Sequence, residues 1–306
     1  MRLVIIGLDG LDPDLVEKWE MEWFKLKVWG RHYVGFFKYT YTPIVWGSFL
    51  TGVNVEEHGY DIESLRRKRS EDALKYSILK SLYRLKSRLV PFKLGLRKVL
   101  VRLGLAYEYP PSIMPKKLLR MSFTEELKSL GYRVAVVEVP AVNESRNEYY
   151  RGMVPKAIGN ALLRDALVDE ALADTGSRIS KAIGYVVNGY DLVFTYSPLP
   201  DIAFHLAPKP RLNDVLWLRV THYRLWCIIE RLVRTAINRG YAVLIVSDHG
   251  FDIKRYDHSK YGYWSLSIDA GWKINTVLDF KQEIVNLVIG NIDLRKPLPP
   301  PIKWRK

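Results

Sequence analysis

The stretch Ala-Val-Leu-Ile-Val-Ser-Asp-His-Gly, residues 242–250, decides the fold that we predict for this chain. Its first six residues are almost continuously apolar and rich in β-branched side chains, which is typical of a strand buried on both faces. Similar runs occur at Leu3–Leu8, Tyr132–Val139 and Leu192–Tyr196. Strands of this kind indicate a parallel sheet that helices cover on both sides.

Helical patterns separate these runs. Asp12-Pro13 is typical of an N-cap followed by a proline in the first turn. Ser122–Glu125 matches a capping box, and a long helix is predicted from about Asn213 to Asn238, ahead of Gly240. The alternation of strand and helix predicts an α/β fold with a doubly wound, mostly parallel sheet flanked by helices. We expect residues 1–306 to form a single domain of this class.

Residues 64–120 interrupt the alternation and are predicted to form an inserted basic helical cap. Between positions 65 and 105 the sequence has thirteen basic and two acidic residues, a net +11 of the +14 carried by the whole chain. One helical face in this segment is apolar, since its members fall three or four residues apart: Leu74, Ile78, Leu82, Leu85 and Leu89. A second basic helix is predicted through Arg97–Arg102.

The sequence leaves four interpretations of this basic segment open. It is a solvated cap that packs on the main domain, or a cap that also steers anionic substrates toward a site. In a third interpretation, the segment binds nucleic-acid phosphates, with Tyr76 and Tyr83 available for stacking. Alternatively, residues 65–105 bind an anionic membrane surface, as basic amphipathic helices do.

Targeting signals and disulfides are not apparent in the sequence. No apolar run reaches the roughly 18 residues of a spanning helix, and the N-terminus lacks the pattern of a signal peptide. Cys227 is the only cysteine, so an intramolecular disulfide is excluded. A cytoplasmic protein is therefore expected, while the oligomeric state is left open.

Asp and His residues follow three of the predicted strands. Asp9 lies just past the first strand, and Asp248-His249 follows Ala242–Ser247 directly. Asp201 and His205 follow Leu192–Tyr196 through a short proline-containing loop. In an open α/β sheet, ligands gather at the carboxyl ends of the strands. Because Asp and His together suit Zn²⁺ or Mn²⁺, this placement predicts a metal site.

Each of these residues also has a structural interpretation. Asp9 before a glycine is typical of a turn, and Asp201 with His205 is compatible with a pair on a helix surface. Asp248-His249 at a strand end is harder to explain as structure, because both side chains need partners there. Because these Asp and His residues follow three separate strands, we favour a metal site over three independent structural roles. We assign capping or solvent-facing roles to Asp12 and Asp14, and structural roles to His32, His58 and His222.

The segment Thr42–Gly52, Thr-Pro-Ile-Val-Trp-Gly-Ser-Phe-Leu-Thr-Gly, adds a more specific signal. With Glu57-His58-Gly59 it resembles the nucleophile segment of type I phosphodiesterases and nucleotide pyrophosphatases, which belong to the alkaline phosphatase superfamily. In that family a Thr or Ser opens a helix that leads into T-G-x-x-x-x-x-H-G. The family's other motifs match this sequence at Asp9, at Asp201 and His205, at Ser247–Gly250 and at His258. The resemblance spans about residues 3–62 and 122–265.

This resemblance implies an alkaline-phosphatase-like fold with two divalent metal ions, Zn²⁺ in the first place and Mn²⁺ as the alternative. It implies that Asp201, His205 and His258 hold one ion. The second would be held by Asp9, Asp248 and His249, with the oxygen of Thr42 as a further ligand. A bound metal makes a threonine hydroxyl reactive, and a helix start favours phosphate oxygens. Thr42 is therefore the predicted nucleophile.

The predicted function is a two-metal phosphohydrolase that cleaves phosphodiester or pyrophosphate bonds of nucleotide-like, anionic small molecules through a covalent phosphothreonine. The family usually carries an Asn shortly after the H-G, but Gly59–Glu63 contains none. A phosphomonoesterase or phosphotransferase on the same site is therefore the alternative. A non-catalytic basic binding protein that retains the fold is the rival of another class. The sulfatase signature, Cys or Ser followed by x-Pro-x-Arg, is missing.

Overall fold

The computed structural model describes residues 1–65, 112–207 and 211–290. Most of the predicted basic cap, 64–120, lies outside these described residues, and so does nearly all of the basic span 65–105. The binding of nucleic acid or an anionic membrane by that span stays a prediction. The described end of the cap contains the short helix α6 (Lys116–Leu119). None of the helices within the described ranges is long and apolar enough to cross a membrane.

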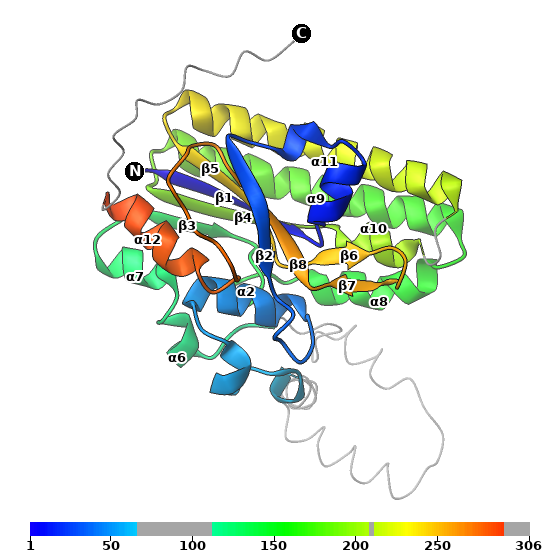
Figure 1. Cartoon of the computed structure of the whole chain (residues 1–306), viewed down its shortest axis with the longest axis horizontal. Helices are drawn as coiled ribbons and strands as arrows, with labels where there is room; N and C mark the ends of the chain where they lie inside the picture. The colour runs from blue at the N-terminus through cyan, green and yellow to red at the C-terminus, as the bar shows by residue number, and fades with distance from the viewer. Residues whose placement is uncertain (66–111, 208–210, 291–306) are drawn as a thin grey trace, which may run out of the picture.

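A six-stranded sheet forms the centre of the molecule (Figure 1). In the order in which they pair, its strands are β2 (Val28–Tyr33), β8 (Tyr261–Leu266), β5 (Ala242–Ser247), β1 (Leu3–Asp9), β4 (Leu192–Pro200) and β3 (Val134–Val137). The four strands from β5 to β3 are parallel, as predicted, whereas β8 runs antiparallel to β5 and β2 antiparallel to β8. The sheet is therefore mostly parallel, with an antiparallel extension at one edge.

Helices cover both faces of the sheet because β1 is apolar on both sides. Val4, Ile6 and Leu8 face one layer, and Leu3 and Ile5 face the other, as alternating residues of a strand do. The first layer contains α1 (Pro13–Lys18), η1 (Glu22–Phe24), α8 (Asn147–Ala157), α9 (Ala161–Val187), α10 (Asp201–Leu206) and α11 (Leu212–Asn238). The second contains α2 (Thr42–Thr51), η2 (Val55–His58), α6, α7 (Phe123–Ser129) and α12 (Phe280–Ile289).

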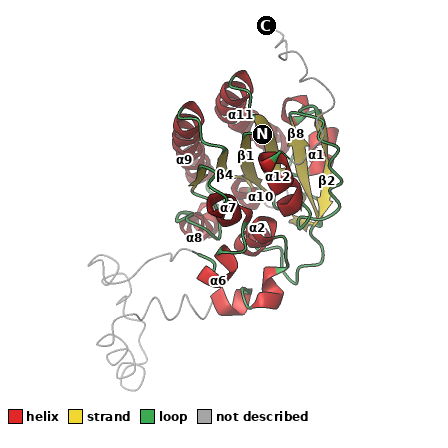
Figure 2. Ribbon diagram, turned by 90° about the vertical axis from the view of Figure 1, so that its left-hand side faces the viewer, coloured by secondary structure: helices red, strands yellow, loops and turns green. Residues whose placement is uncertain are grey.

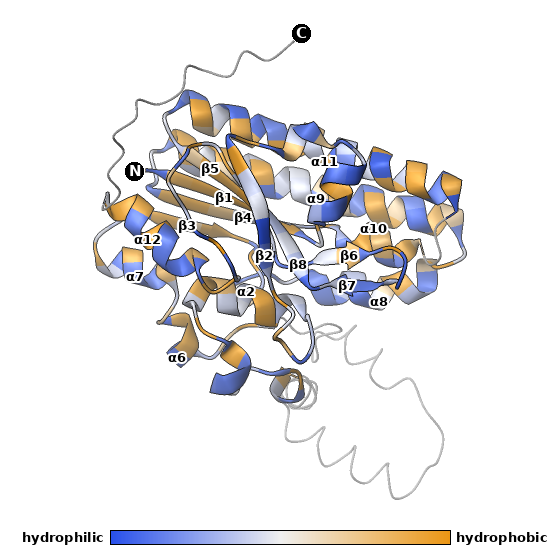
Figure 3. Ribbon diagram, in the orientation of Figure 1, coloured by the Kyte–Doolittle hydropathy of each residue, from blue (hydrophilic) through white to orange (hydrophobic). Residues whose placement is uncertain are grey.

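The layers can be followed in Figures 1 and 2, where α9 and α11 lie on the opposite side of the sheet from α2 and α6. The apolar strands β1, β4 and β5 lie between them (Figure 3). Outside the main sheet, β6 (Gly250–Asp252) pairs with β7 (Asp257–Ser259) in a small hairpin that follows β5. This arrangement confirms the predicted α/β class with helices on both faces.

The predicted helix ends are formed by the caps that the sequence indicated. Asp12 Oδ1 accepts a hydrogen bond of 3.0 Å from the backbone N–H of Leu15 at the start of α1. Ser122 Oγ accepts one of 3.3 Å from the N–H of Glu125 at the start of α7. Each bond satisfies an N–H group that the first turn of a helix leaves without an internal partner. The predicted long helix is α11, which begins at Leu212 and ends at Asn238.

Candidate metal centre

The adjacent strands β4, β1 and β5 each bring a buried aspartate to the same edge of the sheet. Asp9 is the last residue of β1, Asp201 follows β4 directly and Asp248 follows β5 directly. Because the three strands are parallel neighbours, their carboxyl ends lie side by side. The exposed fractions of the three residues are 4%, 9% and 1%. Three carboxylates are therefore buried together at this edge of the sheet, where an unpaired charge is energetically unfavourable.

Asp201, His205 and His258 form the first of two groups of ligand atoms. One ligand atom of each lies within 4.8 Å of the others. His205 Nε2 is 3.3 Å from Asp201 Oδ2, and His258 Nε2 is 3.5 Å from Asp201 Oδ1. The Nδ1 atom of His258 lies 2.9 Å from the carbonyl oxygen of Thr40, which leaves Nε2 directed at the group. This is the set that the sequence predicted for one metal.

The connection between β4 and this group differs from the prediction. The sequence suggested a short loop before Asp201, but β4 continues to Pro200 and α10 begins at Asp201. Asp201 and His205 are therefore four residues apart on one helix, where side chains at this spacing lie on the same face. They do not form a helix-surface pair, because Asp201 is buried against the ends of the strands.

Asp9, Asp201 and His249 form the second group, again with ligand atoms within 4.8 Å of one another. His249 Nε2 lies 3.3 Å from Asp9 Oδ1 and 3.5 Å from Asp248 Oδ2. In the predicted second set, the carboxylates of Asp9 and Asp248 thus both lie near His249 Nε2. Asp201 contributes a ligand atom to both groups, which the sequence did not indicate.

A close approach between β1 and the start of α10 explains the shared position of Asp201. The register of β1 against β4 shifts between Leu8 and Asp9, so that Asp9 pairs with Pro200. The next residue, Gly10, has a φ of +76°, and a Cβ atom on it would lie 2.9 Å from Asp201 Cβ. Only glycine adopts this backbone conformation readily and also leaves this space.

Four buried atoms in or beside the two groups lack a hydrogen-bond partner among the described residues: Asp9 Oδ1, Asp201 Oδ1, Asp248 Oδ2 and His249 Nε2. A buried polar atom left in this way costs about 1–3 kcal/mol. Native proteins contain few such atoms, and where they occur a bound ion or water commonly supplies the missing partner. Three carboxylates with three imidazoles are a donor set that Zn²⁺ or Mn²⁺ accepts. The residues present therefore fit divalent metal ions.

The pKa values of the ligand groups express the same crowding. Burial, followed by the charge of Asp9, raises the pKa of Asp248 well above its usual range. Burial would lower the pKa of His249, but Asp248 and Asp9 outweigh it and raise the pKa to about 10. Burial would raise the pKa of Asp201, but the charge of His205 holds it well below its usual range. These shifts share one cause, the crowding of buried carboxylates and imidazoles at the ends of the strands.

Thr42, the predicted nucleophile, lies against this cluster. It is the first residue of α2, is 1% exposed, and its hydroxyl donates to Asp9 Oδ2 at 3.4 Å. The positive end of the helix dipole therefore faces the space around Oγ1. The structure brings Thr42 together with the six predicted metal ligands.

Two further polar residues contact the cluster without any signal in the sequence. Tyr196, at the centre of β4, donates from its hydroxyl to Asp9 Oδ2 at 2.5 Å and accepts from Asn147 Nδ2 at 2.9 Å. Arg151 on α8 donates from Nη2 to Thr42 Oγ1 at 3.1 Å. Both reach the site through tertiary packing, so neither follows from a local pattern.

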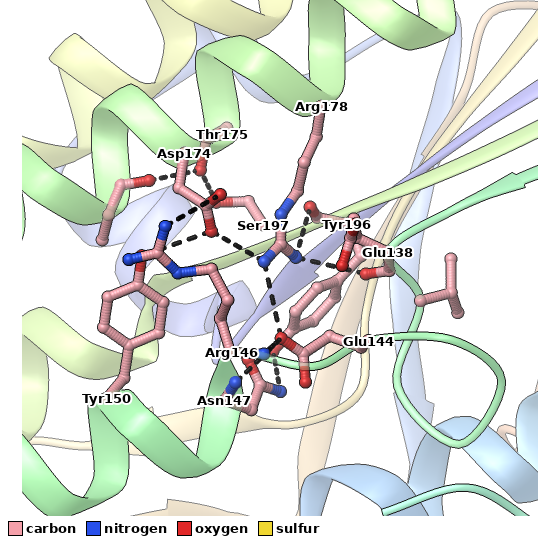
Figure 4. A network of polar contacts seen from close by, with 12 residues as sticks. Glu138, Glu144, Arg146, Asn147, Tyr150, Asp174, Thr175, Arg178, Tyr196 and Ser197 are labelled. Atoms are coloured by element: carbon pink, nitrogen blue, oxygen red, sulfur yellow. Dashed lines mark hydrogen bonds and ion pairs between the residues drawn. The ribbon is translucent and has the colours of Figure 1, made fainter. Parts of the chain in front are cut away.

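A buried ion-pair network supports Tyr196 from behind (Figure 4). Arg178, which is 1% exposed, lies 2.7 Å from Asp174 Oδ2 and 3.4 Å from Glu144 Oε1. The same Glu144 oxygen accepts from the backbone N–H of Asn147 at 2.8 Å. Breaking one partner of a buried pair is costly, since the other charge is left uncompensated. The network therefore fixes α8, α9 and β4 relative to one another directly behind Asp9.

The residues to which the sequence gave structural roles are not members of the two groups of ligands, although His32 lies near Asp248 and His249. Asp14 is exposed and pairs with Arg31 at 2.8 Å, and His58 is exposed at the end of η2. His222 is buried in α11, with Nδ1 2.7 Å from the carbonyl oxygen of Leu218. His32 is also buried, and burial lowers its pKa to about 3.

Comparison with known proteins connects this fold to solved structures. No protein-family model matches the chain, and no curated protein matches its sequence. A candidate sulfatase from Bacteroides thetaiotaomicron matches 99% of this chain and 72% of its own, with a TM-score of 0.50 and 9% identity. Ectonucleotide pyrophosphatase/phosphodiesterase 5 matches 82% of this chain at TM-scores of 0.42 for the murine and 0.45 for the human protein, with 14% and 15% identity.

This chain spans 57% of the length of the two pyrophosphatase structures. At such low identity, the likeness to the sulfatase structure establishes the fold and nothing about the reaction. The predicted alkaline-phosphatase-like architecture is thereby confirmed.

Proposed function

We propose that this chain is a two-metal phosphohydrolase in which Thr42 attacks phosphorus and forms a covalent phosphothreonine. The observation that carries the proposal is the contact between the Thr42 hydroxyl and Asp9 at the edge of a buried Asp/His cluster with unpartnered ligand atoms. A hydroxyl placed at a helix start and beside two cation sites is suited to nucleophilic attack on a phosphate ester.

In this proposal Asp201, His205 and His258 hold one divalent ion. Asp9, Asp248 and His249 hold the other, which also takes the oxygen of Thr42. Zn²⁺ is the expected ion, with Mn²⁺ as the alternative. Such ions supply the Lewis acidity that lowers the pKa of a bound hydroxyl and neutralises developing charge. Asp201 belongs to both groups of ligand atoms, so one substitution there should disturb both sites.

The remaining chemistry belongs to the side chains of the chain itself. The Thr42 Oγ1–phosphorus bond forms while the bond from phosphorus to the leaving oxygen breaks. The hydroxyl proton leaves along the hydrogen bond to Asp9 Oδ2. A water molecule then attacks phosphorus opposite the Oγ1–phosphorus bond and loses a proton, while that bond breaks and Thr42 Oγ1 regains a proton. Two inversions give net retention at phosphorus.

The test is hydrolysis of bis-p-nitrophenyl phosphate and p-nitrophenyl phosphate by the Zn²⁺- or Mn²⁺-loaded protein and by Thr42→Ala. We expect about two metal ions per chain in both proteins and a loss of turnover of about 10³-fold or more in Thr42→Ala, because the residue that accepts the phosphoryl group is removed. Thr40→Ala is the matched control, since Thr40 contacts the site only through its main-chain oxygen.

Near wild-type turnover in Thr42→Ala would show that another residue is the nucleophile. Loss of the metals together with turnover would make Thr42 a structural residue of the site. If the reconstituted wild-type protein bound no metal, the rival interpretation of a non-catalytic basic binding protein would replace the proposal.

A further inference from the structure

Helix α11 has an exposed apolar row that the proposed chemistry does not use. Leu216, Val220 and Tyr223 are 51%, 56% and 54% exposed, and Cys227 in the same row is also exposed. We call these four residues the α11 stripe. Apolar side chains scattered singly are normal on a surface, whereas a contiguous row marks a place of interaction. From Asn213 onward, the other exposed positions of this helix are all Asn or Arg: Asn213, Arg219, Arg224, Arg231, Arg234 and Asn238.

The α11 stripe faces away from the rest of the fold. The opposite side of α11 buries Leu218, Leu225 and Ile229 in the core of the first helix layer. Residues three or four positions apart share one face of a helix, so this burial turns the stripe outward. In Figures 1 and 2, α11 lies at the outer boundary of the molecule, next to α9. The packing of the described residues therefore does not explain why the stripe is apolar.

The spacing within the stripe is that of a seam between two helices. From Leu216 to Cys227 the steps along the chain are four, three and four residues. Alternating steps of three and four keep a narrow row on one face, which is the pattern with which one helix packs against another. A helix that lies on a membrane surface has a broader apolar face. The partner that fits this row is therefore another helix.

The same spacing makes the stripe complementary to itself. Its steps are four, three and four in either direction, so a two-fold axis between Val220 and Tyr223 lays the row on its own reverse. In two antiparallel copies, Leu216 then lies opposite Cys227, and Val220 lies opposite Tyr223. Each pair joins a larger side chain to a smaller one, so the two rows can interdigitate at the density of a protein interior. A closed two-fold interface uses the same surface of both copies in this way.

The cations beside the stripe are held by their own chain. Arg224 pairs with Asp169 on α9 at 2.8 Å, and Arg219 donates to the carbonyl oxygen of Trp19 at 3.1 Å. A second copy can therefore approach the stripe without burying either guanidinium as an unpaired charge. The same contacts weaken the attraction of these cations to anionic lipid headgroups. The charges at the borders of the stripe thus favour a second copy over a membrane.

We propose that the α11 stripe is the interface through which two copies of this chain form an antiparallel, two-fold symmetric dimer. Helix α11 has 27 residues and is about 40 Å long, so the helix pair extends beyond the stripe at both ends. The Asn and Arg residues at its borders supply the polar rim that protein interfaces have. The stripe contains none of the candidate metal ligands, so the dimer does not depend on the reaction proposed for Thr42.

Analytical ultracentrifugation of the full chain measures the association between about 1 and 100 μM, a range that reports dissociation constants near 10⁻⁶ M. We expect the wild type to approach twice the mass of one chain as its concentration rises. Leu216→Glu should raise the dissociation constant by about 10²-fold or more, because the two-fold axis buries the new charge twice. Leu130→Glu is the matched control, since Leu130 is 58% exposed at the end of α7 in the other helix layer. It should keep the wild-type dissociation constant.

The single native cysteine tests the register of the two helices. In the antiparallel pair the two Cys227 residues are roughly 16 Å apart along the helices, eleven residues at about 1.5 Å each, whereas a disulfide needs Cα atoms within about 7 Å. Wild-type protein oxidised with diamide should therefore not form a covalent dimer. Leu216→Cys places a new thiol opposite Cys227 of the second copy, and each disulfide formed there gives two electrons and two protons to diamide. A covalent dimer is expected on a non-reducing gel, and none from the control Leu130→Cys.

A wild type that sediments as one chain at every concentration would overturn the inference. Equal dissociation constants in wild type and Leu216→Glu, or a covalent dimer formed by the wild type through Cys227, would overturn it as well. If circular dichroism shows that Leu216→Glu does not fold, the smaller change Leu216→Cys decides the question by its crosslinking. Binding of a monomeric wild type to vesicles of phosphatidylcholine and phosphatidylserine, lost in Leu216→Glu, would assign the stripe to a lipid surface instead.

Discussion

Replacing Tyr196 by Phe tests whether the ion-pair network behind the cluster positions the metal ligands. The hydroxyl of Tyr196 donates to Asp9 Oδ2 at 2.5 Å, while Asp9 Oδ1 is left directed at His249 Nε2, 3.3 Å away. One oxygen of Asp9 is thus held from behind and the other is free to bind a metal. Such outer contacts orient a ligating carboxylate before the metal arrives.

The expected effect follows from the contacts that the substitution removes. Loss of an outer hydrogen bond to a metal ligand typically weakens metal affinity by about 10–100-fold. Tyr196→Phe also leaves the buried Asn147 Nδ2 without the hydroxyl that it donates to, at a cost of about 1–3 kcal/mol in the free energy of unfolding. We therefore expect weaker Zn²⁺ binding together with a modest loss of stability of the metal-free protein.

The assay is competition for Zn²⁺ between the protein and a chelator of known affinity, with urea unfolding of the metal-free protein alongside. Tyr150→Phe is the control, because its hydroxyl donates to the carboxylate of Asp174 at 3.2 Å, within the same network, and not to Asp9. Tyr150→Phe should lose stability and keep its Zn²⁺ affinity. Wild-type Zn²⁺ affinity in Tyr196→Phe, or an equal loss in both variants, would refute the reasoning.

Two further predictions concern backbone geometry and pH. Gly10→Ala should weaken metal binding and destabilise the fold by more than Gly159→Ala, because both glycines have positive φ but only Gly10 lies against Asp201; equal Zn²⁺ affinities in the two variants would contradict this. His222 is buried, and burial lowers its pKa to about 4. The unfolded chain therefore binds a proton below about pH 6.5 that the folded chain does not, so stability is lost as pH falls. Between pH 7 and pH 5 the metal-free wild type should lose about 2 kcal/mol more than His222→Gln in urea unfolding; identical losses would show that His222 titrates normally.

The parts of the fold that the sequence predicted are those with a local cause. The run Ala242–Ser247 is a strand with the bounds that its apolar residues indicated. Asp12 and Ser122 cap the helices that follow them, because their side chains bond to N–H groups only three residues away. In these cases the bounds of the strand or helix are set by residues within it or next to it in the sequence.

The antiparallel edge of the sheet could not be predicted in this way. Strand β2 pairs with β8 across more than two hundred residues, and its first four residues alternate between half-buried and exposed before the buried His32. Gly262 in β8 lies against His32 of β2, where a Cβ atom would meet the imidazole ring. The strand thus depends on a fit between distant residues, and neither sequence segment carries that information alone.

The same distinction applies to the candidate centre. Asp9 and Asp248 could be placed from the sequence because each directly follows an apolar strand, and parallel strands end at one edge. The position of Asp201 beside both groups depends on the register shift at Asp9 and on the missing side chain of Gly10. Such a close approach becomes visible only when β1 and α10 are in place.

Arg151 shows most clearly why chemistry can escape a sequence pattern. It lies on α8, 109 residues from Thr42 in the chain, and nothing in the residues around it distinguishes it from other basic residues. What makes it significant is the ring of Tyr41 beneath it and the hydroxyl of Thr42 in front of it. The guanidinium reaches the Thr42 hydroxyl from the layer of helices opposite to α2, and only the assembled sheet determines that placement.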